Sequence, residues 1–177
     1  MGTVLERKPE SQCSLYERDY HAWLEEQARI LKSGQIGSLD IRNLIEEIED
    51  MGRSEEAGLQ SAIEQALLHL TKLAFSPSSD PRRGCQASVV KQRVEIEKRL
   101  RRNPGLQSKM NALYQESWPD ARKLAIAEMA AHNESPAIPS ECPFSMKEVR
   151  DENYWPKALS LAAALGQGRR SSKGIDR

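Results

Sequence analysis

The segment Asp40–Gly52 reads DIRNLIEEIEDMG and has the clearest amphipathic pattern in this chain of 177 residues. Its apolar residues recur every three or four positions, which places them on one stripe of an α-helix. They are Ile41, Leu44, Ile45, Ile48 and Met51. Asp40 is a suitable N-cap and Gly52 a suitable stop, so a helix is predicted between them. This segment decides the fold class, because the sequence on both sides repeats the same period.

Helical patterns fill most of the remaining chain. A first helix is predicted over residues 15–32, and a long one over 54–75 whose second half is apolar on nearly every side and therefore central. Further helices are predicted over 87–102 and 106–132, and Pro119 should kink or split the latter. No stretch alternates apolar and polar residues as a strand would. We expect an all-α fold, a single bundle of about five to six helices.

Prolines mark the C-terminal part of the chain. Pro136, Pro139 and Pro143 predict an irregular strap over residues 136–155, with Ile138 and Phe144 docked on the bundle. A short terminal helix is expected over 155–165. The domain boundaries follow: a flexible N-terminus over 1–13, a bundle domain over 14–165 and a disordered basic tail over 166–177.

Composition restricts the class of protein. No apolar run approaches the roughly 20 residues of a membrane span, and the first nine residues lack the apolar stretch of a signal peptide, so we expect a cytoplasmic protein. Cys13, Cys85 and Cys142 are widely spaced and are predicted to be free thiols. The net charge of zero conceals two complementary segments, an acidic one over 40–56 and a basic one over 82–102.

Several motifs together resemble the bacterial "domain of unknown function 29" family, from about Ser14 to Pro156. They are Tyr16-Glu17-x-Asp19 with Trp23, Asn43-Leu44-Ile45-Glu46-Glu47-Ile48-Glu49-x-Met51-Gly52-x-Ser54-Glu55, Leu68-His69-Leu70-x-Lys72, Gln92-Arg93, Asn103-Pro104-x-Leu106 and Cys142-Pro143. The resemblance implies an all-helical bundle of unestablished role. Two departures are a missing tryptophan near Cys85 and the proline at 119, where the family's helix is typically smoother.

Carboxylates on the Asp40–Gly52 helix are the first candidates for a site. Glu47 and Glu49 flank the apolar stripe and can reach inward, whereas Glu46 and Asp50 point to water. Paired carboxylates bind divalent metal in helical bundles, but the second Glu-x-x-Asp motif of a pyrophosphohydrolase and the Glu-x-x-His of a di-iron site are both missing. A solvated helix face with ion pairs at its rim is the alternative.

His69 and Arg93 are the other candidates. His69 lies at the edge of the apolar stripe on the central helix, either as a hydrogen-bonded core residue or as a metal ligand. Arg93 falls on the same face as Val89, Ile96 and Leu100, where a buried guanidinium requires a partner. We predict a buried salt bridge from Arg93 to Glu47 or Glu49, with His69 within hydrogen-bonding distance.

Two functions remain open at this point. The first is an interaction or accessory module that binds a protein partner or self-associates as a homodimer, without a cofactor. The second is a metal-assisted hydrolase or nuclease that uses Glu47, Glu49, His69 and Arg93, with the first three as metal ligands. Nucleic acid is not an expected partner, because the basic segment lacks aromatic residues for stacking and the total charge is neutral. A membrane is not expected either.

Overall fold

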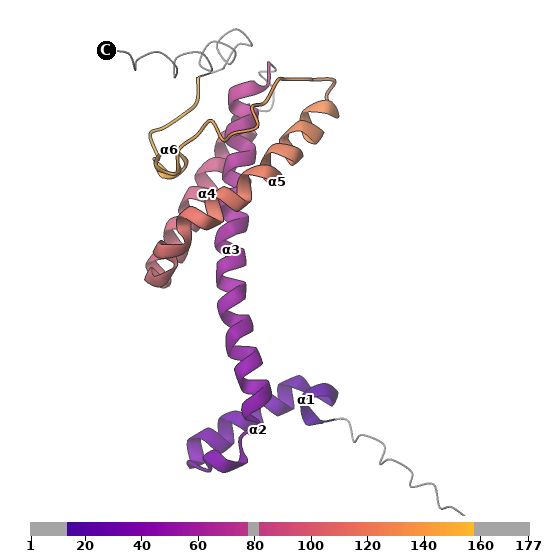
Figure 1. Cartoon of the computed structure of the whole chain (residues 1–177), viewed down its shortest axis with the longest axis vertical. Coiled ribbons are helices and arrows are strands. Elements are labelled where there is room, and N and C mark those ends of the chain that lie inside the picture. Colours follow the sequence, from indigo (N-terminus) through magenta and orange to yellow (C-terminus); the bar gives the residue numbers. More distant parts are fainter. Residues whose placement is uncertain (1–13, 78–81, 158–177) are drawn as a thin grey trace, which may run out of the picture. The chain divides into compact units, whose positions relative to one another are not determined.

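The computed structural model describes residues 14–77 and 82–157, and every regular element in these two ranges is a helix (Figure 1). The all-α prediction is confirmed. The chain divides after Gly52 into two compact units, a smaller N-terminal one and a larger C-terminal one. Among the residues described, no helix combines the length and the apolar composition that a membrane span requires. The flexible N-terminus and the basic tail predicted from the sequence lie outside the described residues.

The N-terminal unit consists of α1 (Leu15–Arg18), α2 (Tyr20–Ser33), the 3-10 turn η1 (Ile36–Ser38) and the first part of α3. The single helix predicted over 15–32 is wrong, because Asp19 interrupts it. The side chain of Asp19 accepts a hydrogen bond from Ala22 N at 2.9 Å, so this residue is the N-cap of a new helix. Gly34 ends α2 with φ +74°, the left-handed conformation that glycine adopts without strain.

Helix α3 runs from Ile41 to Phe75 without a break, through the position where a stop was predicted. Glycine inside a helix costs only about 1 kcal/mol relative to alanine, and the helix-forming residues on both sides of Gly52 outweigh that cost. The second half of α3 is buried on most of its surface, as its apolar sequence predicted. Its fully buried residues include Leu59, Ile63, Leu67 and Leu70.

The C-terminal unit packs α4 (Arg82–Arg102) and α5 (Met110–Ala130) against the second half of α3, with the 3-10 turn η2 (Pro104–Lys109) between them (Figure 1). Pro119 does not split α5. The carbonyl that loses its partner to the proline ring belongs to Gln115, and both residues are exposed, so water can take the place of the missing N–H. Cys85 and Cys142 are free thiols, as expected, and Cys13 lies outside the described residues.

Residues 136–155 form the strap, which α5 holds through a row of donors four residues apart. Tyr114 donates to the carbonyl of Phe144, Trp118 to that of Ser140 at 2.7 Å, and Arg122 to that of Pro139 at 2.8 Å. The predicted docking is confirmed, because Ile138 and Phe144 are buried.

Part of the strap is regular, contrary to the expectation. The short helix α6 (Met146–Arg150) begins with a capping box, in which the Ser145 side chain accepts from Glu148 N and the Glu148 carboxylate from Ser145 N. This local signal outweighs the neighbouring prolines. Residues 155–157 are not helical, and the rest of the predicted terminal helix lies outside the described residues.

Candidate functional site

Glu47 anchors α3 to the two helices that precede it. The hydroxyls of Tyr16 and Tyr20 donate to its two carboxylate oxygens, each at 2.5 Å. These bonds favour the neutral phenols, so the pKa of Tyr16 rises to about 12, chiefly through the hydrogen bond to Glu47, and that of Tyr20 rises for the same reason. Because both oxygens of Glu47 accept from tyrosine, this carboxylate connects helices of the N-terminal unit rather than presenting a free base.

A second contact holds α2 on the start of α3. Trp23 is buried and donates from its indole nitrogen to Asp40 at 3.1 Å, and the Gln27 side chain accepts from the backbone N–H of Asp40 at 2.8 Å. Tyr16 and Tyr20 pack their rings against Trp23. The side of α3 that carries Glu47 is therefore covered by α2 and its aromatic residues.

The apolar stripe of α3 remains exposed within the N-terminal unit. We define this surface, the α3 stripe, as Ile41, Ile45, Ile48 and Met51, which expose 50%, 53%, 66% and 70% of their area. Large exposed apolar residues are ordinary when single and informative when they follow one helix face. Leu24, Leu31 and Ile36 of the same unit are also exposed. The sequence predicted the stripe correctly, but the structure leaves it uncovered in the residues described.

Arg93 is buried, as predicted, but its predicted salt bridge to Glu47 or Glu49 is wrong. Its guanidinium donates to three carbonyls of the strap, those of Val149 at 2.8 Å, Glu148 at 3.1 Å and Tyr154 at 2.9 Å. Its Cζ also lies 5.0 Å from the ring centre of Trp155.

The strap supplies Arg93 with an alternative to a carboxylate. Two of its acceptor carbonyls close the end of α6, where helix carbonyls lack partners within the helix. Burial lowers the pKa of Arg93, as expected for a guanidinium that binds dipoles rather than a formal charge. Glu97, one turn further along α4, binds Arg150 at 2.7 Å.

His69 is half-buried on α3, and its Nδ1 has no hydrogen-bond partner among the described residues. The cluster predicted beside His69 does not form, because Arg93 binds the strap and Glu47 binds two tyrosines. Desolvation lowers the pKa of His69, and the nearby Lys72 adds to the effect. Lys72 itself pairs with Glu128 at 2.6 Å. This environment favours a neutral imidazole.

The metal ligands proposed from the sequence do not come together in the residues described. Within the two described ranges, no group of three or more His, Cys, Asp or Glu side chains is arranged to hold a metal ion. Glu49 is exposed on α3 of the N-terminal unit, whereas Glu47 binds two tyrosines. The expectation that the chain needs no cofactor stays a prediction.

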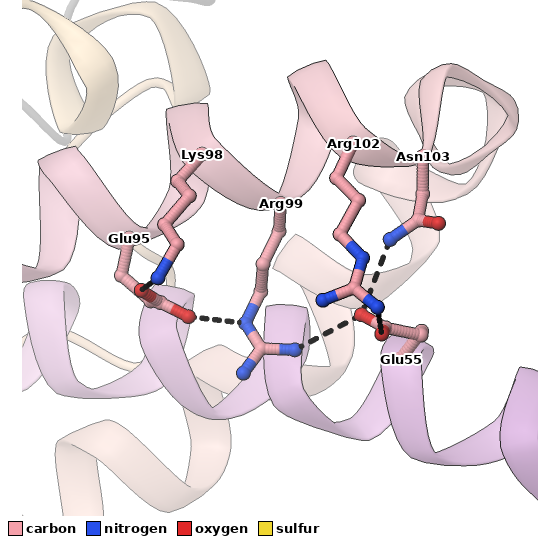
Figure 2. A network of polar contacts seen from close by, with 6 residues as sticks. All are labelled: Glu55, Glu95, Lys98, Arg99, Arg102 and Asn103. Atoms are coloured by element: carbon pink, nitrogen blue, oxygen red, sulfur yellow. Dashed lines mark hydrogen bonds and ion pairs between the residues drawn. The ribbon is translucent and has the colours of Figure 1, made fainter.

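A charged network that was not predicted as a site joins α3 to the end of α4 (Figure 2). Glu55 accepts from Asn103 at 3.1 Å and pairs with Arg99 at 3.3 Å and with Arg102 at 3.9 Å. Arg99 also pairs with Glu95 at 2.8 Å. The complementary charges of segments 40–56 and 82–102 were the signal for this network.

Gly58 makes the position of Arg99 possible. A Cβ atom at residue 58 would lie 2.5 Å from Cζ of Arg99, so any larger side chain would displace the guanidinium. The network is about two-thirds buried at Glu55 and Arg99. It neutralises basic residues of α4 and leaves less positive charge for an external anion.

The comparison with known families agrees with the motifs in the sequence. Residues 15–155 match the family model described as Domain of unknown function DUF29. The chain belongs to this family. No curated protein and no solved structure matches this DUF29 chain. The family assignment made from the sequence is thus confirmed.

Proposed function

We propose that this DUF29 protein is an interaction module of the bacterial cytoplasm, and that the α3 stripe is its binding surface. The supporting observation is the exposure of Ile41, Ile45, Ile48 and Met51, which lie on one side of a helix whose other side carries Glu47. An amphipathic helix gains stability by burying its apolar face, and within the described residues this face is not buried. A protein partner supplies the missing contact.

The opposite side of the same helix shows that its orientation is fixed. Tyr16 and Tyr20 bind Glu47, and Trp23 binds Asp40, so α2 holds the helix from one side only. The stripe is therefore presented on a secured helix, which is the arrangement of helix-in-groove and helix-on-helix recognition. Preorganisation of this kind lowers the entropy lost on binding.

A protein partner also fits the charges better than a nucleic acid does. Nucleic acids are bound by unpaired Lys and Arg, whereas Arg99 and Arg102 pair with Glu55, and Lys109 pairs with Glu56. The hydrolase alternative has less support, because Arg93 and Glu47 are engaged in contacts that join helices and strap. No described feature favours a second function over binding.

Site-specific photo-crosslinking in the native host cells tests the proposal. A photoreactive residue at Ile45 should give adducts of discrete mass, and the same residue at the exposed Lys123 of α5 should not. The additional substitution Ile48→Glu should remove the Ile45 adducts, because it places a charge in the apolar contact. Absence of any adduct at Ile45, or equal adducts at Lys123, would refute the function.

A further inference from the structure

We infer that the α3 stripe binds the same stripe of a second copy of this chain, with the two helices antiparallel. The inference rests on the proposed function and names its partner. It follows from the symmetry of the stripe and from the charges beside it.

Four exposed positions of α3 are symmetric about a point between Glu46 and Glu47, whereas Met51 of the stripe lies opposite Arg42 in the same register. Ile41, Ile45, Ile48 and Gly52 follow one another at intervals of four, three and four residues, and all four are exposed. When two such helices run antiparallel about that point, Ile45 of each copy lies opposite Ile48 of the other. Ile41 then lies opposite Gly52, which has open space where a side chain would be and so allows close approach. A two-fold interface requires this self-matching pattern.

Charges at the edge of the stripe select the antiparallel orientation. Arg42 and Glu49 lie three residues before and four residues after Ile45, so both flank it on the same side of α3. In an antiparallel pair, Arg42 of one copy comes within about two residues, or 3 Å along the axis, of Glu49 of the other copy. This contact occurs twice by symmetry. In a parallel pair the two-fold axis runs along the helices, so Arg42 and Glu49 of the two copies lie on opposite sides of the contact and do not meet.

The acidic character of the segment does not oppose this pairing. Glu47 is held by Tyr16 and Tyr20 of its own copy, on the side of α3 that α2 covers. Glu46 and Asp50 are exposed on faces that point away from the stripe. Arg42 and Glu49 place a cation and an anion beside Ile45 in each copy. The antiparallel pair therefore adds two contacts between opposite charges to the burial of the isoleucines.

Charge exchange between the two edge positions provides the test. Sedimentation equilibrium of the full chain should show a reversible dimer, because the stripe is smaller than the roughly 20–30 residues per side of a permanent interface. Arg42→Glu and Glu49→Arg should each weaken self-association about tenfold, since both symmetric contacts become repulsive. An equimolar mixture of the two variants should associate again, because each variant then meets opposite charges. Circular dichroism of each variant checks that the helices are intact.

The outcomes separate this inference from the proposed function. A chain that stays monomeric at every concentration, or a mixture of the two variants that fails to associate, would overturn the antiparallel dimer. If Ile45 then forms adducts with other proteins only, the interaction function stands and the second copy is excluded as its partner. Adducts of twice the chain mass, together with recovery in the mixture, would support the dimer. Adding Ile45→Glu should abolish self-association in every background.

Discussion

Replacing Arg93 should release the strap from α4. Its guanidinium makes three hydrogen bonds to carbonyls, and hydrogen bonds that involve a charged group contribute about 1.5 kcal/mol each at the low end. Two effects make the loss of stability smaller than the sum of these bonds. The alanine variant has no cation to desolvate at residue 93, and water can hydrate the carbonyl of the half-exposed Glu148. We expect Arg93→Ala to lower the free energy of unfolding by about 3 kcal/mol.

Further substitutions at residue 93 separate the causes. Arg93→Met keeps the apolar stem that packs in the core and removes the donors, so it should recover part of the loss. Arg93→Lys keeps the charge but cannot reach three carbonyls at once, and should cost about 2 kcal/mol. Arg101→Ala is the matched control, because Arg101 lies on the same helix and is exposed, and it should change stability by less than about 0.5 kcal/mol.

Urea titration followed by circular dichroism measures these differences, and hydrogen exchange locates them. In Arg93→Ala the amides of residues 138–155 should exchange faster, whereas those of the core part of α3 should change only by the global loss of stability. A variant within about 1 kcal/mol of the wild type, or a strap whose exchange is unchanged, would refute the role of Arg93 as the residue that fixes the strap.

Three other predictions concern separate parts of the chain. Gly58→Ala should stabilise the protein by less than the usual glycine-to-alanine gain of about 1 kcal/mol, because the new methyl group displaces Arg99. Urea titration should show the full gain when Gly58→Ala is added to an Arg99→Ala variant. The pKa of His69 in the folded protein is lower than its ordinary value of 6.5, so protonation of His69 favours the unfolded state. Stability should therefore fall as the pH drops below about 6.5, and His69→Leu should flatten this dependence. Deleting residues 166–177, whose Gly, Ser and Arg composition cannot bury apolar area, should leave the calorimetric Tm unchanged within a few degrees.

The sequence predicted what depends on local pattern and composition. The buried half of α3, the end of α2 at Gly34 and the docking of Ile138 and Phe144 follow from periodicity, capping and apolar content, and all were correct. The errors concern competition between neighbouring signals. Gly52 did not end a helix flanked by strong helix formers, and Asp19 began a new helix inside a segment that otherwise looked continuous.

The choice of partners for buried polar groups could not be predicted from the sequence. Periodicity placed Arg93 in the core, but it does not distinguish a carboxylate on another helix from the carbonyls of a strap about 55 residues further along the chain. The strap was predicted to lie on the bundle, yet the direction of its carbonyls depends on α6 and its capping box. The spacing of Tyr114, Trp118 and Arg122 on one face of α5 was a usable signal for those contacts.

Along α3, the same kind of pattern has two different outcomes. The half from Leu59 onward is buried by α4, α5 and the strap. The half that carries Ile41, Ile45 and Ile48 contacts α1 and α2 through Glu47 and Asp40, and the three isoleucines remain exposed. A hydrophobic period indicates which face of a helix is apolar but not what covers it. In the N-terminal unit the buried residues are Trp23, Gln27 and Ile30, within the range described. A core of this size contributes little stability, so the partner proposed for the α3 stripe should stabilise this unit by mass action if it binds only the folded form.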